Sequence, residues 1–92
     1  MEITFDPIKN ARNIAQRALS FDSAESFDFV TAKLWQDARR TYPETRWVAL
    51  GYLGSRLHVM VFNETALGIR VISFRKANPR EGVKHGFTLT RD

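Results

Sequence analysis

The spacing of hydrophobic residues changes near Val30 and divides the chain into a helical first third and a strand-rich remainder. Between positions 8 and 19, apolar side chains recur every three or four residues, which is the period of an amphipathic helix. Asp6-Pro7 precedes this run and predicts a helix start, because the aspartate caps free amides and the proline already has a helical φ. The predicted buried face of this helix consists of Ile8, Ala11, Ala15, Ala18 and Leu19, with Ile14 beside them.

Two shorter elements are predicted on either side of this helix. Met1 to Phe5 is mostly apolar and partly alternating, which predicts a small strand. Ser20 is placed to cap a second helix over Phe21 to Phe29. The apolar stripe of that helix is Phe21, Ala24 and Phe27, and its exposed acids are Asp22, Glu25 and Asp28.

Four strand-forming segments follow, separated by a polar loop over Gln36 to Thr45, a tight Gly54-Ser55 hairpin turn and a loop over Glu64 to Gly68. The third segment is apolar on both faces, which is typical of a central strand that is covered on two sides or lines a cleft. Its alternating sets are Leu57, Val59 and Val61 against His58, Met60 and Phe62. The four predicted strands are Thr31 to Trp35, Arg46 to Leu53, Arg56 to Asn63 and Ile69 to Lys76.

The end of the chain combines a basic strand with a short helix. Simple alternation in the last strand places Arg75 on one face, with Ser73, and Arg70 on the opposite face. Asn78-Pro79 then predicts a helix start, and Glu81 is spaced to complete a capping box. The order predicts a single domain over residues 1–92 with an α+β fold. It consists of two N-terminal helices, an antiparallel sheet and a short C-terminal helix, with the helices on one face of the sheet.

Length and composition restrict the protein to few classes. A chain of 92 residues allows one domain, and 43% hydrophobic residues are sufficient for a packed core. Zero cysteines exclude a disulfide framework and a cysteine nucleophile. No apolar run approaches the roughly 20 residues that span a bilayer, and Glu2 and Asp6 stand where a secretory signal has basic residues. We expect a soluble, cytoplasmic protein that is not membrane-bound.

Motifs for cofactor and metal chemistry are missing from the sequence. The two histidines, His58 and His85, are far apart and have no thiols or clustered carboxylates around them, so no metal site is expected. The glycines are isolated turn residues and form neither a phosphate-binding loop nor a dinucleotide fingerprint. No serine stands in a nucleophile elbow. We therefore expect no cofactor.

The net charge of +4 is concentrated at the end of the chain. Up to Gly68, eight bases balance eight acids, whereas the following 24 residues contain six bases and two acids. This asymmetry indicates a surface that faces a polyanion. Arg70 and Arg75 fit such a surface because guanidinium groups bind phosphate bidentately and stay charged. The alternative for both is ordinary ion pairing with Glu64 or Glu81. The six terminal bases are Arg70, Arg75, Lys76, Arg80, Lys84 and Arg91.

Three segments resemble the BrnT family of RelE-like ribonuclease toxins. Ile3-Thr4-Phe5-Asp6-Pro7 with Lys9 and Asn13, followed by Leu19-Ser20-Phe21, is similar to the opening of that family. Glu44-Thr45-Arg46-Trp47 with Gly51 is similar to its central strand. The most specific segment is Arg70-Val71-Ile72-Ser73-Phe74-Arg75-Lys76-Ala77 with Glu81. The chain departs from the family pattern at Arg17 and Phe62, where the family often has histidine.

The resemblance implies a RelE-like fold and a toxin that cleaves RNA and halts translation. It also implies neutralisation by a BrnA-type ribbon-helix-helix antitoxin. The toxin would then contact DNA only indirectly, through this antitoxin. Attack by the 2′-hydroxyl of the RNA itself needs neither a metal nor a protein nucleophile, and arginines stabilise its phosphorane. We expect Arg70 and Arg75 to bind phosphate, with His85 or Glu64 as the acid–base group. The expected secondary RNA contacts are Lys9, Arg46, Lys76 and Arg80.

Alternatives remain open for the function and for single residues. The departures at Arg17 and Phe62 also fit a catalytically weakened module that binds antitoxin or nucleic acid without cleaving RNA. A free-standing DNA-binding regulator is disfavoured because the sequence has no recognition helix with clustered base-reading side chains. An alternative interpretation of His85 is a mobile histidine in solvent, and an alternative interpretation of His58 is a core residue with a satisfied hydrogen bond.

Overall fold

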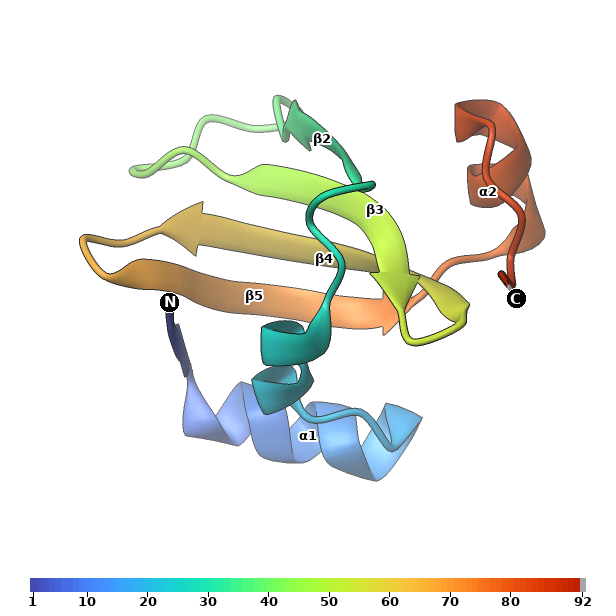
Figure 1. The fold of residues 1–92 in the computed structure, drawn as a ribbon. Helices are drawn as coiled ribbons and strands as arrows, with labels where there is room; N and C mark the ends of the chain where they lie inside the picture. The colour runs from blue at the N-terminus through green and yellow to red at the C-terminus, as the bar shows by residue number, and fades with distance from the viewer. Residues whose placement is uncertain (92) are drawn as a thin grey trace.

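A five-stranded mixed sheet crosses the molecule, with its helices packed on both faces (Figure 1). The computed structural model describes residues 1–91. The strand order is β1-β5-β4-β3-β2, in which β1 is parallel to β5 and the other neighbours are antiparallel. The expectation of a purely antiparallel sheet is therefore wrong at one edge. The strands are β1 (Glu2–Phe5), β2 (Lys33–Gln36), β3 (Trp47–Leu53), β4 (Arg56–Glu64) and β5 (Gly68–Lys76); the helices are α1 (Pro7–Arg17), the 3₁₀ helix η1 (Phe21–Ser26) and α2 (Pro79–His85).

The two faces of the sheet carry separate hydrophobic clusters. On one face, Met60 and Phe62 of β4 pack with Phe21 of η1 and with Phe27, which follows η1. On the other face, Leu57 and Val59 pack with the residues that flank α2, and Gly82 of α2 lies against Leu57. The prediction that β4 is covered on two sides is confirmed. The prediction that the helices share one face is wrong, because α2 covers the face opposite to α1 and η1.

The second helix is shorter than predicted and has a different geometry. Ser20 caps it as expected, but η1 is a 3₁₀ helix that ends at Ser26. Phe27 is extended (φ −68°, ψ 135°) and forms a bridge with Leu53 of β3. Phe27 also meets Phe29 and Phe74 edge to face, so burial of these rings in the core ends the helix before Phe27.

Side-chain amides, rather than an apolar stripe, hold α1 against the rest of the fold. Ile8 and Ile14 are 70% and 46% exposed, and Asn13 is the buried residue of this helix. Asn13 Nδ2 donates hydrogen bonds of 3.0 Å to the carbonyls of Leu19 and Phe74. The predicted buried face is therefore wrong, and the outer surface of α1 is exposed and partly apolar.

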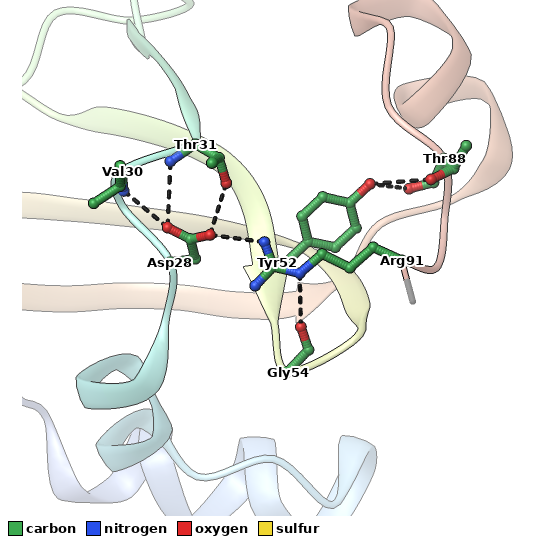
Figure 2. Close-up of polar contacts among 7 residues, drawn as sticks. All are labelled: Asp28, Val30, Thr31, Tyr52, Gly54, Thr88 and Arg91. Atoms are coloured by element: carbon green, nitrogen blue, oxygen red, sulfur yellow. Dashed lines mark hydrogen bonds and ion pairs between the residues drawn. The ribbon is translucent and has the colours of Figure 1, made fainter.

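A network of polar contacts attaches the end of the chain to the centre of the molecule (Figure 2). Arg91 donates to Asp28 at 2.7 Å and to the Gly54 carbonyl at 3.2 Å, and its guanidinium lies 4.5 Å from the centre of the Tyr52 ring. The Tyr52 hydroxyl donates to the Thr88 carbonyl at 2.8 Å. These contacts fix the segment that follows α2, and α2 itself is part of the candidate site.

Removing Arg91 should make the protein less sensitive to acid in one pH range. The hydrogen bond from Arg91 is the largest of the contacts that lower the pKa of Asp28 from 3.8 to about 2. A lowered carboxyl pKa contributes stability that is complete above about pH 4 and is lost as the pH falls towards 2. Arg91→Ala should therefore lower the melting temperature at pH 6 but have a smaller effect at pH 2. Arg12→Ala, which removes an exposed base of α1, is the control; an equal effect of Arg91→Ala at both pH values would contradict the linkage.

No helix in the described part of the chain is both long enough and apolar enough to cross a membrane.

Candidate functional site

A groove of about 500 Å³ lies on the α2 face of the sheet, between α2 and the loop that follows β2. Val48, Val59 and Val61 of the central strands form its floor. Arg75 and Glu81 form one wall, and residues 35–39 form the other. The groove thus combines an apolar floor with charged walls, and two sequence-predicted features, the basic end of β5 and the start of α2, meet there.

Arg75 and Glu81 form a bidentate ion pair beside the groove. Nη1 and Nη2 of Arg75 each donate to one carboxylate oxygen of Glu81 at 2.8 Å. This contact is the main cause that lowers the pKa of Glu81 to about 2, and it raises the pKa of Arg75. Glu81 also accepts from the Asn78 amide and completes the predicted capping box of α2. The ion pair between Arg75 and Glu81, one of the alternatives considered from the sequence, is confirmed. It fixes the orientation of the guanidinium group, and Nε of Arg75 takes no part in it.

His85 lies next to the groove, one turn after Glu81 on α2. Its ring stacks on Trp35, which lines the groove, with ring centres 4.7 Å apart and planes 18° apart. Burial, followed by the positive charges of Lys33 and Lys84, lowers the pKa of His85 below 6.5. Nδ1 of His85 is buried and has no hydrogen-bond partner within residues 1–91, so Nε2 is the ring nitrogen left for proton exchange. His85 is therefore held by an aromatic partner and is not a mobile solvent histidine.

The opposite wall contains a second ion pair that the sequence analysis did not single out. Asp37 is 4% exposed and accepts from Arg39 Nε and Nη2 at 2.9 and 2.8 Å. These bonds lower the pKa of Asp37 to about 2. The Arg39 side chain is 78% exposed at the groove. Nothing in the sequence distinguishes Asp37 and Trp35 from other loop and strand residues, because their positions depend on the pairing of β2 with β3 and on the path of the loop that follows β2.

A β-bulge places Arg70 and Arg75 on the same face of the sheet. Val61 of β4 pairs with Ser73, whereas the next residue, Phe62, pairs with Val71. Ile72 is therefore an extra residue in β5, and it reverses the alternation of the side chains that precede it. The prediction that Arg70 and Arg75 face opposite sides is wrong for this reason. The two arginines are at most about 17 Å apart along the strand.

Arg70 lines a smaller hollow of about 200 Å³ on the same face as the groove. Arg46 lines the hollow with it and stacks over Tyr42, with 4.0 Å from the guanidinium carbon to the ring centre. Asn63, which pairs with Arg70 in the sheet, donates to the Thr45 carbonyl and holds this loop. Among residues 1–91, Arg46 and Arg70 take part in no ion pair. The hollow therefore offers two available guanidinium groups and an aromatic ring.

The structure separates the other predicted residues from the groove. Glu64 lies at the far end of β4, on the η1 face, where it lines an apolar hollow with Phe62 and Ile69. Lys9 is exposed on α1, and Arg80 is exposed in the first turn of α2. Lys76 pairs with His58 and so points to the η1 face. Of the predicted site residues, Arg75 lines the groove and His85 lies next to it. Arg70 and Arg46 lie on the same face of the sheet, in the smaller hollow, whereas Glu64 lies on the opposite face.

No group of three His, Asp or Glu residues within residues 1–91 is arranged to hold a metal ion.

A model of the family described as the ribonuclease toxin BrnT of type II toxin–antitoxin systems matches residues 5–81. The chain belongs to the BrnT family. BrnT proteins are the toxins of such pairs, so an antitoxin partner is implied. The matched BrnT segment contains Arg46, Arg70, Arg75 and Glu81, whereas His85 lies beyond it. No curated protein matches the chain.

Proposed function

We propose that this BrnT-family protein is a metal-independent endoribonuclease whose active site is the groove between Arg75 and Trp35. The observation that carries the proposal is the orientation of Arg75 by Glu81, with the stacked His85 one helical turn away. An oriented guanidinium binds a phosphodiester through two N–H groups and stabilises the extra negative charge of the phosphorane. Glu81, with its pKa near 2, is a weak proton acceptor, so its role is to position Arg75.

The chemistry needs only the substrate and the side chains around the groove. The 2′ oxygen of the RNA attacks the adjacent phosphorus while the bond from phosphorus to the 5′ oxygen breaks. The proton of the 2′-hydroxyl passes to neutral His85, and the departing 5′ oxygen takes a proton from water. The products are a 2′,3′-cyclic phosphate and a 5′-hydroxyl end. A lowered pKa keeps His85 neutral at pH 7, which is the form that accepts a proton.

The rest of the same face is proposed to hold the RNA strand. Arg46 and Arg70 would bind phosphates next to the cleavage site, and the Tyr42 ring would stack with a base. Cleavage of cytoplasmic RNA by a RelE-like domain over residues 1–92 would stop translation. A BrnA-type ribbon-helix-helix antitoxin would neutralise the toxin by covering the groove with an acidic or apolar arm. Arg80, which is exposed in the first turn of α2 and outside the groove, would be an additional contact of a longer RNA strand.

Cleavage in the presence of a chelator tests the proposal. Purified protein should cut a single-stranded RNA oligonucleotide in EDTA and leave 2′,3′-cyclic phosphate and 5′-hydroxyl ends, while an all-2′-O-methyl oligonucleotide should remain intact. Activity that disappears in EDTA and returns with Mg²⁺ or Mn²⁺ would contradict the mechanism. Folded protein that binds RNA but cuts neither free nor ribosome-bound RNA would instead favour a binding module without catalysis. The contact that supports this alternative is the ion pair with Glu81, in which both terminal nitrogens of Arg75 take part.

A further inference from the structure

A second basic cavity lies on the opposite face of the sheet, at the C-terminal end of α1. Its volume is about 400 Å³, which is in the range of small-ligand sites. Three cations line it and no acid does: Arg17 from α1, with Arg75 and Lys76 from the end of β5. The dipole of α1 accounts for a cation at position 17, but it does not account for Lys76 and Arg75. Arg75 is paired with Glu81, whereas Arg17 and Lys76 take part in no ion pair within residues 1–91. Two unpaired positive charges in one cavity favour an anionic ligand.

The polar group at the base of this cavity is His58, which is 4% exposed. Its Nδ1 is 2.8 Å from the Arg56 carbonyl and must donate to it, since a carbonyl only accepts. Burial, and then the charges of Arg56 and Lys76, lower the pKa of His58 below 6.5. In the neutral ring with a proton on Nδ1, Nε2 is a hydrogen-bond acceptor. Nε2 of His58 has no hydrogen-bond partner among residues 1–91. It is also not fully buried, because Nδ1 of His85 is the one fully buried side-chain nitrogen or oxygen in this part of the chain that lacks a partner.

We propose that the cavity of Arg17, His58 and Lys76 binds one ribonucleotide of the RNA substrate and distinguishes RNA from DNA. The phosphate is held by Arg17 and Lys76, and the ribose 2′-hydroxyl donates to Nε2 of His58. An acceptor for the 2′-hydroxyl next to phosphate-binding cations is the combination that separates RNA from DNA at a site. Because Arg75 lines both this cavity and the groove, a single RNA strand that passes over the end of β5 reaches both. The inference rests on the proposed ribonuclease function.

The geometry of His58 supplies a matched pair of variants. In His58→Asn, the amide nitrogen replaces Nδ1 and keeps the bond to the Arg56 carbonyl, but the acceptor in the cavity is lost. In His58→Gln, the longer side chain places its amide oxygen near the position of Nε2. The two variants thus differ at the atom that is proposed to meet the 2′-hydroxyl, and their melting temperatures show whether both remain folded.

The experiment titrates labelled single-stranded RNA or DNA of the same sequence with the protein in EDTA. Every protein carries His85→Phe, and a gel checks that the RNA stays intact. RNA should bind more tightly than DNA to the background protein and to His58→Gln. His58→Asn should lose most of this preference, with RNA affinity reduced about fivefold or more. Arg17→Ala and Lys76→Ala should weaken both ligands and each lower the salt slope by roughly 0.7. Arg12→Ala, on the same helix but outside the cavity, is the control.

The outcome separates this inference from the proposed function. If His58→Asn keeps the preference for RNA, or if Arg17→Ala has the salt slope of Arg12→Ala, the inference is wrong even when the protein cleaves RNA. If the expected differences appear in a protein that cleaves nothing, the cavity is a ribonucleotide site and the ribonuclease proposal fails alone.

Discussion

Arg75→Ala should lower the rate of RNA cleavage by roughly 100-fold or more and prevent growth arrest when the protein is expressed without an antitoxin. Removal of one well-oriented donor to a developing oxyanion typically costs about 10²–10³ in rate. Glu81 remains in the variant, but it cannot bind phosphate and it adds a negative charge beside the substrate. The measurements are the single-turnover rate on an RNA oligonucleotide and the growth of cells after induction.

Two further variants show whether the loss comes from the geometry of Arg75. Arg75→Lys keeps the charge but not the two parallel N–H groups, so it should recover only a small part of the activity. Arg12→Ala removes a base from an exposed position of α1 and should cleave RNA like the unmodified protein. Thermal melting should show that Arg75→Ala remains folded, since its carboxylate partner is partly exposed and can be hydrated. Undiminished toxicity of folded Arg75→Ala would place the phosphate site elsewhere, with Arg70 as the next residue to test.

His85→Phe should reduce cleavage by roughly 10²–10⁴-fold, the range of general acid–base catalysis by one positioned side chain. Phenylalanine preserves the stacking on Trp35 and removes both ring nitrogens, so a loss of activity reports the proton transfer and not the packing. Trp35→Phe is the complementary variant: it keeps an aromatic wall and should have a smaller effect than His85→Phe.

The pH profile provides the specific test of His85. Its pKa is below 6.5 because of burial and because Lys33 on β2 and Lys84 on α2 oppose protonation, whereas Glu81 favours it. A base must be neutral, so the rate should rise with pH through this lowered pKa and level off at a lower pH than it would for an ordinary histidine. The rising limb should be missing in His85→Phe. A rate that falls between pH 6 and 8, or a limb that persists in the variant, would show that His85 is not the base.

Local chemistry in the sequence predicts the starts of the helices with good accuracy. Asp6, Ser20 and Asn78 each cap a helix, and the capping box with Glu81 is present as expected. Gly54 has φ +60° at the tip of the predicted hairpin. These features depend on residues that are close together in the chain, so a pattern of a few letters is sufficient to predict them. The order of the strands along the chain follows for the same reason, because alternation is a local signal.

Predictions that depend on contacts between distant segments are less accurate. The helical period of α1 is correct, but the side that faces the protein is set by Asn13 and the Phe74 carbonyl, which are 61 residues apart. Gly51, read as a turn glycine, lies inside β3, where a Cβ would come within 2.8 Å of Ala32 and Phe27. No spacing rule contains this information, since it arises when the segment after η1 crosses the strand.

The candidate site divides in the same way. Three features can be derived from the sequence alone: positive charge is concentrated after Gly68, Arg75 and Glu81 stand at a strand end and a helix start, and the chain has the segments of the BrnT family. The tertiary structure alone decided which of these residues meet. The extra residue Ile72 turned Arg70 to the face of Arg75, and the pairing of β2 with β3 placed Trp35 against His85. Glu64 was left on the other face. The physical reason is that charge and helix capping belong to single residues and their neighbours, whereas a bulge, a stacked pair and a groove exist only when separate strands are paired in register.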